Sequence, residues 1–422
     1  MLEKILDLHT HSKYSRACSP ALDLPNIAKV CEEKGIDIIS TADFTHPAWF
    51  KHIEENLVED RPGLYKLKNN SSPTRFILGT EISCIYKHKE KVRRLHLLIS
   101  APSIEVAGKF NTALAVRGVN LKSDGRPIMG VSGKEIIKIA LEIDEHIMVI
   151  PAHAWTPWFA VFGSKSGYDS LEECFEELTP HIFAIETGLS SDPTMNHRLT
   201  NLDQITLISN SDAHSLDNLG REANVFAFKD EKDISYREIR RILKEQDRKK
   251  FLYTIEFYPE EGKYHFDGHK DCGICWRPEE TKEAKFICPK CKKKLTVGVL
   301  HRVDDLADRD EKSIPAEKFI PHKYIVPLRE IIAKVFDTGV KSKKVEMEYR
   351  QMIKKLGSEF SILLSKDLKE IERVASDKTI ARAISNMRDG KVKVSPGYDG
   401  VFGVVEVLLN GNERGPRQSR LL

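Results

Sequence analysis

Long apolar runs are absent from this sequence of 422 residues. No stretch is both long enough and free enough of charge to cross a bilayer as a helix, so we expect no membrane partner. A secretory leader is not expected either, because the opening residues Met1–Leu–Glu–Lys4 lead straight into a strand-like run. These absences exclude the classes of protein that work within a membrane.

Cysteine is scarce, with eight residues in the chain. Four of them (Cys18, Cys31, Cys84 and Cys174) are scattered, which is typical of free thiols in a reducing compartment. A disulfide framework is therefore not expected, and we expect the protein to be cytoplasmic. The other four form two C-x-x-C pairs.

Net charge is also small, +3, although 31% of the residues are charged and 41% are apolar. These proportions are typical of a soluble globular protein, and the length allows two or three domains. Residues 1–230 hold 25 Lys and Arg against 31 Asp and Glu, whereas residues 231–422 hold 41 against 32. A basic half suggests contact with an anionic polymer, but a highly charged surface of the thermophile type is an equal alternative.

Residues 1–230 alternate short apolar runs with helical patterns. Ligand-type side chains follow the apolar runs at 5–8, 36–39, 76–78, 147–150 and 207–208. Continuous apolar runs are typical of parallel strands that are buried on both faces. Because catalytic residues of an α/β barrel gather where its strands end, this pattern predicts a barrel with a site on one face.

Histidine, aspartate and glutamate at these positions are the residue types that bind zinc or manganese. Each alone is more often a hydrogen-bonded core residue. Taken together they predict a multinuclear centre that hydrolyses phosphate esters, where one cation activates water and another stabilises the leaving oxygen. The predicted metal ligands are His9, His11, Asp43, His46, Glu81, His96, His153, Asp212 and His214.

Catalysis is assigned to five of these residues, namely His9, His11, Glu81, Asp212 and His214. The choice between Asp43 and His46 is left open. Glu186 and Asp192 either bind metal or cap a turn, with capping favoured for Asp192. We expect Zn²⁺ at this centre, with Mg²⁺ or Mn²⁺ as alternatives.

The C-x-x-C pairs, Cys272 with Cys275 and Cys288 with Cys291, have the spacing of a zinc ribbon. We predict a structural Zn²⁺ held by all four thiolates, which would substitute for a core too small to fold alone. A redox pair is the alternative. Basic stretches at 237–250, 290–294 and 341–344 are predicted to contact nucleic-acid phosphates, although solvation of helices explains each equally well.

The chain is predicted to have four parts. Residues 1–230 form the phosphoesterase barrel, 231–262 a basic connector, and 263–314 the zinc module. Residues 315–422 form a mostly helical domain with helical spacing at 328–336, 345–356 and 368–374, a glycine-rich loop and a flexible tail.

Residues 1–230 resemble the PHP (polymerase and histidinol phosphatase) superfamily. The likeness lies in the His pair at 9 and 11, the segments around Asp43, Glu81 and His153, His96, and the run at 210–214. It implies a distorted (β/α)7 barrel with a trinuclear metal centre. Two positions depart from the pattern: Phe44 stands where His is common, and Arg16 and Cys18 lie where an acidic residue often occurs.

The barrel, cysteine pairs and helical part together resemble the endonuclease Q family, on the stretches 41–47, 151–157 and 396–400. The resemblance implies cleavage of DNA on the 5′ side of hypoxanthine, uracil, xanthine or an abasic site. A flipped base then needs a pocket, and aromatic or glycine residues suit its wall. The candidates for contact with DNA are Trp155, Trp158, Gly397, Tyr398, Gly400 and Phe402.

Four alternatives or additions stay open. A small-molecule phosphatase of the histidinol phosphatase type would share the barrel, and a non-catalytic nucleic-acid-binding scaffold would keep only the fold. Trp155, Trp158 and the loop aromatics are equally compatible with ordinary packing. Residues 418–421 resemble the start of a motif that binds a sliding clamp, although its aromatic pair is absent.

Overall fold

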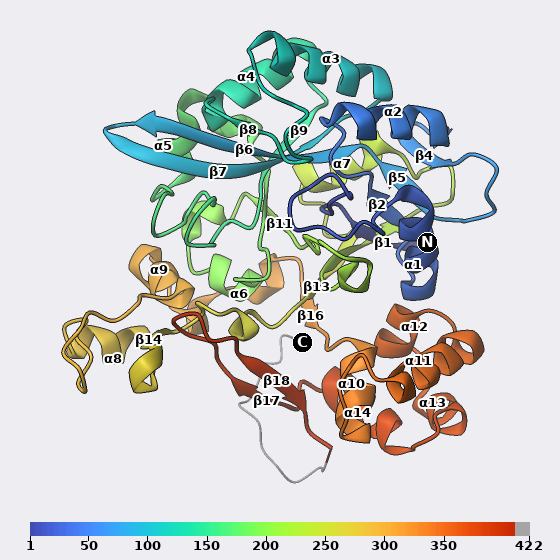
Figure 1. Ribbon diagram of the computed structural model, residues 1–422, viewed down its shortest axis with the longest axis vertical. Coiled ribbons are helices and arrows are strands. Elements are labelled where there is room, and N and C mark those ends of the chain that lie inside the picture. The colour runs from blue at the N-terminus through green and yellow to red at the C-terminus, as the bar shows by residue number, and fades with distance from the viewer. Residues whose placement is uncertain (410–422) are drawn as a thin grey trace. The chain divides into compact units, whose positions relative to one another are not determined.

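The computed structural model describes residues 1–409 and divides into two compact units. The first consists of Met1–Cys31, Ile36–Thr254 and Arg302–Pro321, and the second of Glu32–Gly35, Ile255–His301 and the chain from His322 onward (Figure 1). The predicted flexible tail and the sliding-clamp motif at 418–421 lie outside the described residues. The predicted division into four parts stays a prediction.

Strands of the first unit close into a distorted barrel. They are β1 (Leu2–Asp7), β2 (Ile38–Ser40), β5 (Arg75–Ile77), β6 (Gly79–His88), β7 (Lys91–Ser100), β9 (Met148–Pro151), β10 (Ala184–Glu186) and β11 (Thr206–Ile208). β1, β2 and β5 pair in parallel, β6 continues β5, and β7 runs antiparallel to both β6 and β9. A bond from the Ala154 amide to the Glu186 carbonyl joins β9 to β10, and β10 pairs with β11. A parallel bridge between Thr10 and Ala213 returns to β1 and completes the ring.

Further strands extend the sheet on either side of this ring. They are β3 (Leu57–Arg61), β4 (Leu64–Leu67), β8 (Ile128–Met129), β12 (Ala223–Phe228) and β13 (Phe251–Glu256). The largest sheet of the unit has the order β13–β12–β1–β2–β5–β4–β3. Its central strands β2, β5 and β12 are buried along their whole length, as continuous apolar runs require.

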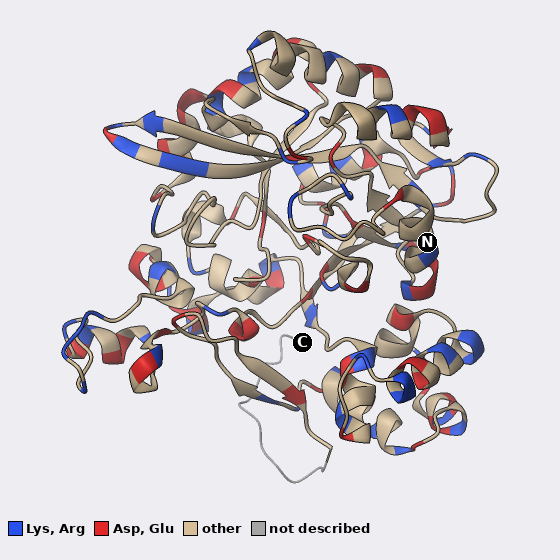
Figure 2. Cartoon of the chain, viewed as in Figure 1, with Lys and Arg blue, Asp and Glu red and all other residues tan. Residues whose placement is uncertain are grey.

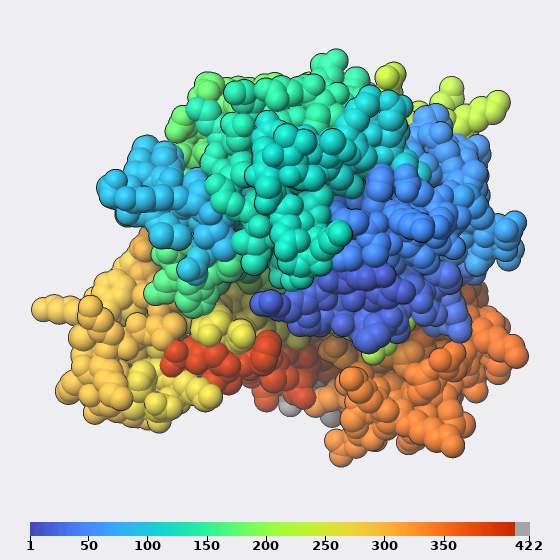
Figure 3. All heavy atoms as spheres, turned by 45° about the horizontal axis from the view of Figure 1, so that its top comes forward, coloured from blue at the N-terminus to red at the C-terminus, as the bar shows by residue number. Residues whose placement is uncertain are grey.

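Helices pack around the barrel, and most begin at a side chain that caps the first turn. They are α1 (Leu24–Lys34), α2 (Pro47–Asn56), α3 (Ile104–Val116), α4 (Gly133–Ile143), α5 (Leu171–Phe175), α6 (Pro193–Asn196) and α7 (Tyr236–Lys244). Ser103, Ser132, Ser170 and Ser235 each accept a hydrogen bond from a backbone amide of the helix that follows. Helices α2 to α4 form much of the surface seen in the space-filling view (Figure 3).

The second unit combines a small β module with a helical bundle. Its elements are β14 (Asp267–His269), β15 (Ile274–Trp276), α8 (Pro278–Glu283), β16 (His322–Tyr324), α10 (Leu328–Phe336), α11 (Lys343–Leu356), α12 (Glu359–Leu364), α13 (Leu368–Val374), α14 (Thr379–Arg388), β17 (Val392–Ser395) and β18 (Val404–Val407). Helix α9 (Val299–Leu306) crosses from this unit into the first. Lys and Arg alternate with Asp and Glu over the helices of the bundle (Figure 2).

The predicted fold class is confirmed: an α/β barrel is followed by a module with the cysteine pairs and a helical C-terminal region. The predicted helices 328–336 and 368–374 coincide with α10 and α13. Within residues 1–409, no helix combines the length and apolar character that a membrane span needs.

Candidate metal centre

Predicted ligands lie where the barrel strands end. His9 and His11 follow β1, Glu81 lies in β6 and His96 in β7. Asp43, His153 and Asp212 follow β2, β9 and β11, and each has a positive φ angle (41°, 30° and 45°). Non-glycine residues adopt this conformation rarely, and such strain concentrates at functional sites. The backbone is thus bent at three strand ends so that side chains turn toward one point.

His9, His11 and Asp212 form a first group of possible ligands whose donor atoms lie within 4.8 Å of one another. The Asp212 Oδ1 atom is 3.0 Å from His11 Nε2 and 3.6 Å from His9 Nε2. Both histidines are fully buried, so their nitrogens face one another rather than water. Two imidazoles and one carboxylate are a donor set that suits zinc or manganese.

Glu81, His96 and His153 form a second group on the neighbouring strands. The Glu81 Oε1 atom is 2.6 Å from His96 Nδ1 and 3.1 Å from His153 Nε2. The two imidazole nitrogens are themselves 3.1 Å apart. All three side chains are buried, which again gives a compact set of one carboxylate and two imidazoles.

Glu81 connects the two groups. While its Oε1 atom faces His96 and His153, its Oε2 atom is 3.4 Å from His11 Nε2 and 3.8 Å from His9 Nε2. A carboxylate with one oxygen toward each group is the arrangement that bridges a pair of cations. The two groups therefore lie close enough together to form one candidate site for two cations.

A second layer of carboxylates orients the histidines. The Nδ1 atom of His9 is 3.0 Å from Glu186 Oε1, and Nδ1 of His11 is 3.3 Å from Asp43 Oδ1. Carboxylates that hold one ring nitrogen in this way turn the other nitrogen toward a metal. The other nitrogen of His9, Nε2, is buried and has no hydrogen-bond partner within residues 1–409. That orphaned atom, facing two carboxylates, fits a bound cation.

The pKa shifts of the two buried histidines give the same indication. Burial alone would lower the pKa of His9, but the carboxylates of Glu186 and Asp212 outweigh it and raise the pKa to about 10. The pKa of His11 is raised well above its ordinary value because Asp212 and Asp43 outweigh burial. The neighbouring carboxylates thus favour a positive charge on the two imidazoles. A divalent cation would supply that positive charge and displace the protons.

Asp7 supports the backbone beneath the centre. It is fully buried and accepts hydrogen bonds from the amides of Ser211 (3.1 Å) and Gly220 (3.0 Å). Burial raises its pKa to about 6 even though these bonds favour the charged form. The residue fixes the turn that leads to Asp212.

Three predicted ligands, Asp43, His46 and His214, lie beside the groups rather than in them. His46 precedes α2 as its N-cap residue and stacks on Tyr14 with ring centroids 4.3 Å apart, whereas Asp43 contacts His11. The choice between Asp43 and His46 as a metal ligand stays open. His214 has its ring centroid 4.5 Å from that of His11, and its Nδ1 atom is 2.9 Å from the carbonyl oxygen of Asp212. Phe44, at the irregular position, is buried.

Two residues at the centre were absent from the predicted ligand list. Glu186 follows the run at 182–185, which is the signal that singled it out for ligation or capping, and the structure makes it the partner of His9. Arg126 donates from Nη1 to Glu81 Oε2 at 2.9 Å, but its loop has no motif that would reveal this contact. Asp192 caps α6 as favoured, accepting a bond from the Met195 amide at 2.7 Å.

The predicted DNA contacts differ in exposure. Trp155 is buried, donates to Asn196 and packs on Phe162, so the structure gives it a core role instead of a surface for stacking. Trp158 is 43% exposed and Phe402 is 71% exposed. Tyr398 packs against the backbone at Gly268.

The same loop, 396–403, depends on small residues. A Cβ atom at Gly397 would collide with the Gly262 carbonyl oxygen, and Gly400 has a positive φ of 87°. These glycines explain how the loop lies so close to the segment at 260–268.

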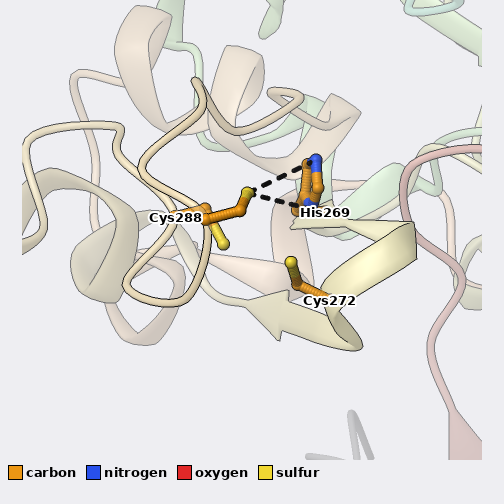
Figure 4. A group of neighbouring side chains, drawn as sticks. His269, Cys272 and Cys288 are labelled. Carbon is orange, nitrogen blue, oxygen red and sulfur yellow. Dashed lines mark hydrogen bonds between the residues drawn. The ribbon is translucent and has the colours of Figure 1, made fainter.

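The cysteine module gathers a ligand set that differs in one member from the predicted one. The residues that converge are His269, Cys272, Cys288 and Cys291, of which Figure 4 labels the first three. Cys275 lies outside this group. Cys275 sits opposite Gly268 in the β14–β15 hairpin, while His269 sits opposite Ile274, so strand alternation puts Cys275 on the other face. One histidine with three thiolates is also a zinc set.

The chain is similar to known proteins over much of its length. Residues 327–391 match the family described as the MJ0043 C-terminal domain. The uncharacterized protein YqxK of Bacillus subtilis is 27% identical over 390 residues, which are 90% of this chain and 91% of that protein. The uncharacterized protein MJ0043 of Methanocaldococcus jannaschii is 30% identical over 262 residues, and the match spans 31% of its length.

Two solved structures are similar over almost the whole chain. The lesion-specific endonuclease PfuEndoQ from Pyrococcus furiosus is 30% identical with a TM-score of 0.84, and the match covers 96% of each chain. An endonuclease Q complex with a 27-mer duplex that carries an abasic lesion at the active site is 30% identical with a TM-score of 0.82, covering 96% of this chain and 97% of that one. Because the barrel, the module and the helical region all match at this identity, the chain belongs to the endonuclease Q family.

Proposed function

We propose that this protein is a metal-dependent DNA repair endonuclease that hydrolyses the phosphodiester on the 5′ side of a deaminated base or an abasic site. The observation that carries the proposal is the pair of ligand groups joined by Glu81, in a chain that matches endonuclease Q over 96% of its length. The deaminated bases are hypoxanthine, uracil and xanthine.

Zn²⁺ is the ion we assign to the centre, because both groups combine imidazoles with a carboxylate. His9, His11, Asp212 and His214 would hold one cation, and His96 and His153 another, with Glu81 between them. When bound, such cations lower the pKa of water and stabilise charge on the leaving oxygen. Mn²⁺ and Mg²⁺ are the alternative ions to test.

The side chains of the centre set up the reaction in defined ways. Glu186 and Asp43 hold a proton on Nδ1 of His9 and His11, so that Nε2 of each ring faces the reacting atoms. Burial of the histidines excludes bulk water. Hydrolysis adds one water: a bond forms from its oxygen to phosphorus, one phosphorus–oxygen ester bond breaks, and the departing oxygen takes up a proton.

Contact with DNA phosphates away from the reacting one is assigned to the second unit. Lys290, Lys292, Lys293 and Lys294 are exposed, and within residues 1–409 they form no ion pair. By contrast, Arg241 and Lys250 of the stretch 237–250 are paired with Glu238, Asp247 and Asp233, which neutralise them. The lysines of the cysteine module are therefore the better candidates for phosphate contact. His269, Cys272, Cys288 and Cys291 would hold the structural Zn²⁺ of this module.

One assay tests the proposal. Duplexes with a single deoxyinosine, deoxyuridine or abasic site, labelled at one end, are incubated with the protein and Zn²⁺ or Mn²⁺. We expect a nick on the 5′ side of each lesion, and we expect His11→Ala to slow it by at least about 10³-fold, because a catalytic set fails when one member is removed. His181→Ala, at an exposed histidine of the same unit, should nick like the wild type.

Other outcomes would contradict the proposal in distinguishable ways. Hydrolysis of p-nitrophenyl phosphate without nicking would indicate a small-molecule phosphatase. Tight binding to the duplex without turnover under any metal would indicate a non-catalytic scaffold. Nicking that survives in His11→Ala would place the reaction elsewhere in the chain. We also propose a cytoplasmic location, because free cysteines are typical of a reducing compartment.

A further inference from the structure

Arg126 is a charged group at the centre that the ligand scheme does not use. It lies in the loop between α3 and β8, and its Nη1 atom donates to Glu81 Oε2 at 2.9 Å. Its side chain is 24% exposed, so the guanidinium reaches from the buried carboxylate toward solvent. Within residues 1–409 its other guanidinium N–H groups form no hydrogen bond. A guanidinium has five N–H donors in a planar fork, so most of its donors stay available.

The loop holds Arg126 at a fixed place. The amide of Gly125 donates to the Tyr14 carbonyl at 3.0 Å, and Thr45 Oγ1 donates to the Gly125 carbonyl at 3.3 Å. A Cβ atom at position 125 would collide with the Asp43 carboxylate and the Ser15 hydroxyl. The residue before Arg126 is thus packed directly against the second layer of the centre, which only glycine permits.

A purely structural role accounts poorly for this arrangement. Glu81 already contacts four histidines, and bound cations would satisfy its charge without help. A fixed positive charge next to a metal ligand weakens metal binding through repulsion. Arg126 therefore adds positive charge beyond what the ligands require.

A phosphodiester that is being hydrolysed carries negative charge, which the Arg126 guanidinium could bind. The reacting phosphoryl group carries negative charge on its non-bridging oxygens, and a guanidinium fork matches two such oxygens. We propose that Arg126 contacts the non-bridging oxygens of the DNA phosphate that is hydrolysed, and stabilises the charge that develops on them. This inference rests on the proposed function, because it takes the substrate to be a phosphodiester.

Two variants test the inference, Arg126→Ala and Arg126→Lys. The control is Arg117→Ala, because Arg117 lies on the same loop but contacts Glu142 instead of Glu81. In single-turnover nicking of an abasic duplex, Arg126→Ala should be slower by roughly 10²- to 10³-fold, the loss typical of one donor to developing charge. Added guanidinium should restore part of that rate. Arg126→Lys should nick more slowly than the wild type even though it keeps the positive charge, because lysine lacks the planar fork of N–H donors. Arg117→Ala should match the wild type.

Two further readouts do not depend on turnover. Metal content, measured by mass spectrometry, should be the same in wild type and Arg126→Ala. Affinity is then compared, in a His11→Ala background that does not cleave, between an abasic duplex with the natural phosphodiester and one with an uncharged methylphosphonate at the same linkage. The background protein should bind the natural duplex several-fold more tightly, and the added Arg126→Ala change should abolish that preference.

The outcomes separate this inference from the proposed function. If Arg126→Ala loses metal, or keeps the preference for the charged linkage, Arg126 supports Glu81 alone and the inference is overturned. If the wild type nicks no lesion, the proposed function fails, but the comparison of charged and uncharged linkages still decides whether Arg126 binds a phosphate.

Discussion

Glu186 shows how much of the centre depends on a side chain that need not touch a cation. Its Oε1 atom contacts His9 Nδ1 at 3.0 Å and Asn210 Nδ2 at 2.8 Å, and its Oε2 atom accepts a bond from the His153 amide at 2.8 Å. One carboxylate thus orients a histidine of the first group and the backbone of a histidine of the second. The side chain is fully buried, so water does not replace these bonds when they are lost.

Glu186→Gln should therefore weaken metal binding at the centre. We expect affinity to fall about 10- to 100-fold, the range for partners that orient a ligand, because an amide holds the Nδ1 proton of His9 less firmly than a carboxylate does. Competition with a zinc indicator measures the affinity, and Glu172→Gln, at an exposed residue of α5, is the matched control. An unchanged metal affinity in Glu186→Gln would show that the Glu186 carboxylate is not needed to orient the metal ligands.

The hairpin of β17 and β18 depends on close backbone approach. Its loop returns over the segment at 260–268, where Gly403 donates to the Glu261 carbonyl at 3.0 Å and Phe266 donates to the Gly397 carbonyl at 2.9 Å. Asp399 accepts bonds from the Lys270 amide and the Thr296 hydroxyl, each at 2.6 Å. The loop is held on several sides, which presents Phe402 to solvent in a defined position.

Gly403→Ala tests this close packing, because its Cβ atom would collide with the Glu260 carbonyl oxygen. Displacing backbone in a packed region costs about 1–3 kcal/mol, so the unfolding midpoint of the second unit in urea should fall. Gly339→Ala, where no atom lies within 4 Å of the added Cβ, should keep or slightly raise the midpoint. Equal midpoints for the two variants would mean that the loop accommodates the added Cβ atom without loss of stability.

Sequence patterns predicted the elements whose signals are local. Helices α10 and α13 followed from apolar spacing of three and four, and the strands β2 and β9 from continuous apolar runs. The ligands at the strand ends followed from the same runs. The long β6–β7 hairpin was not predicted, because its outer half is partly exposed and carries Lys and Arg.

The unpredicted parts of the site depend on pairing between distant segments. Cys275 and His269 differ in direction because of the register of one hairpin, which the C-x-x-C spacing does not reveal. Arg126 meets Glu81 across 45 residues through a loop without periodicity. Whether His46 or Asp43 serves the centre depends on where α2 begins, since His46 lies at its cap and turns toward Tyr14.

The barrel unit and the cysteine module have apolar cores of unequal size. The barrel unit has a large apolar core that includes Leu6, Ile38 and Phe226, whereas the cysteine module clusters Ile274, Cys288 and Leu295 with two partly buried neighbours. So small a cluster does not hold a fold by itself, and a bound metal would supply the missing stabilisation. The barrel should remain folded when the module does not.

Single thiol variants test this division and the ligand set together. Cys288→Ser should release the structural Zn²⁺ and raise amide hydrogen exchange across 267–296, with exchange in the barrel strands unchanged. Cys275→Ser should keep its Zn²⁺ and its protection, because Cys275 lies outside the gathered ligands. If Cys275→Ser instead lost Zn²⁺ and His269→Ala kept it, the ligands would be the four thiolates that the spacing predicts.

Closure of the barrel also sets the time at which the centre assembles in the cell. The His11–Asp212 contact spans 201 residues, and the bond from the His11 amide to the Ala213 carbonyl joins the same ends. At a synthesis rate of about 5–20 residues per second, the first histidines wait roughly 10–40 s on the ribosome for their partner. Contacts so distant in the chain also form slowly once it is released. Metal loading is therefore a late step of biogenesis, and the nascent chain carries no hydrolytic activity until the barrel closes.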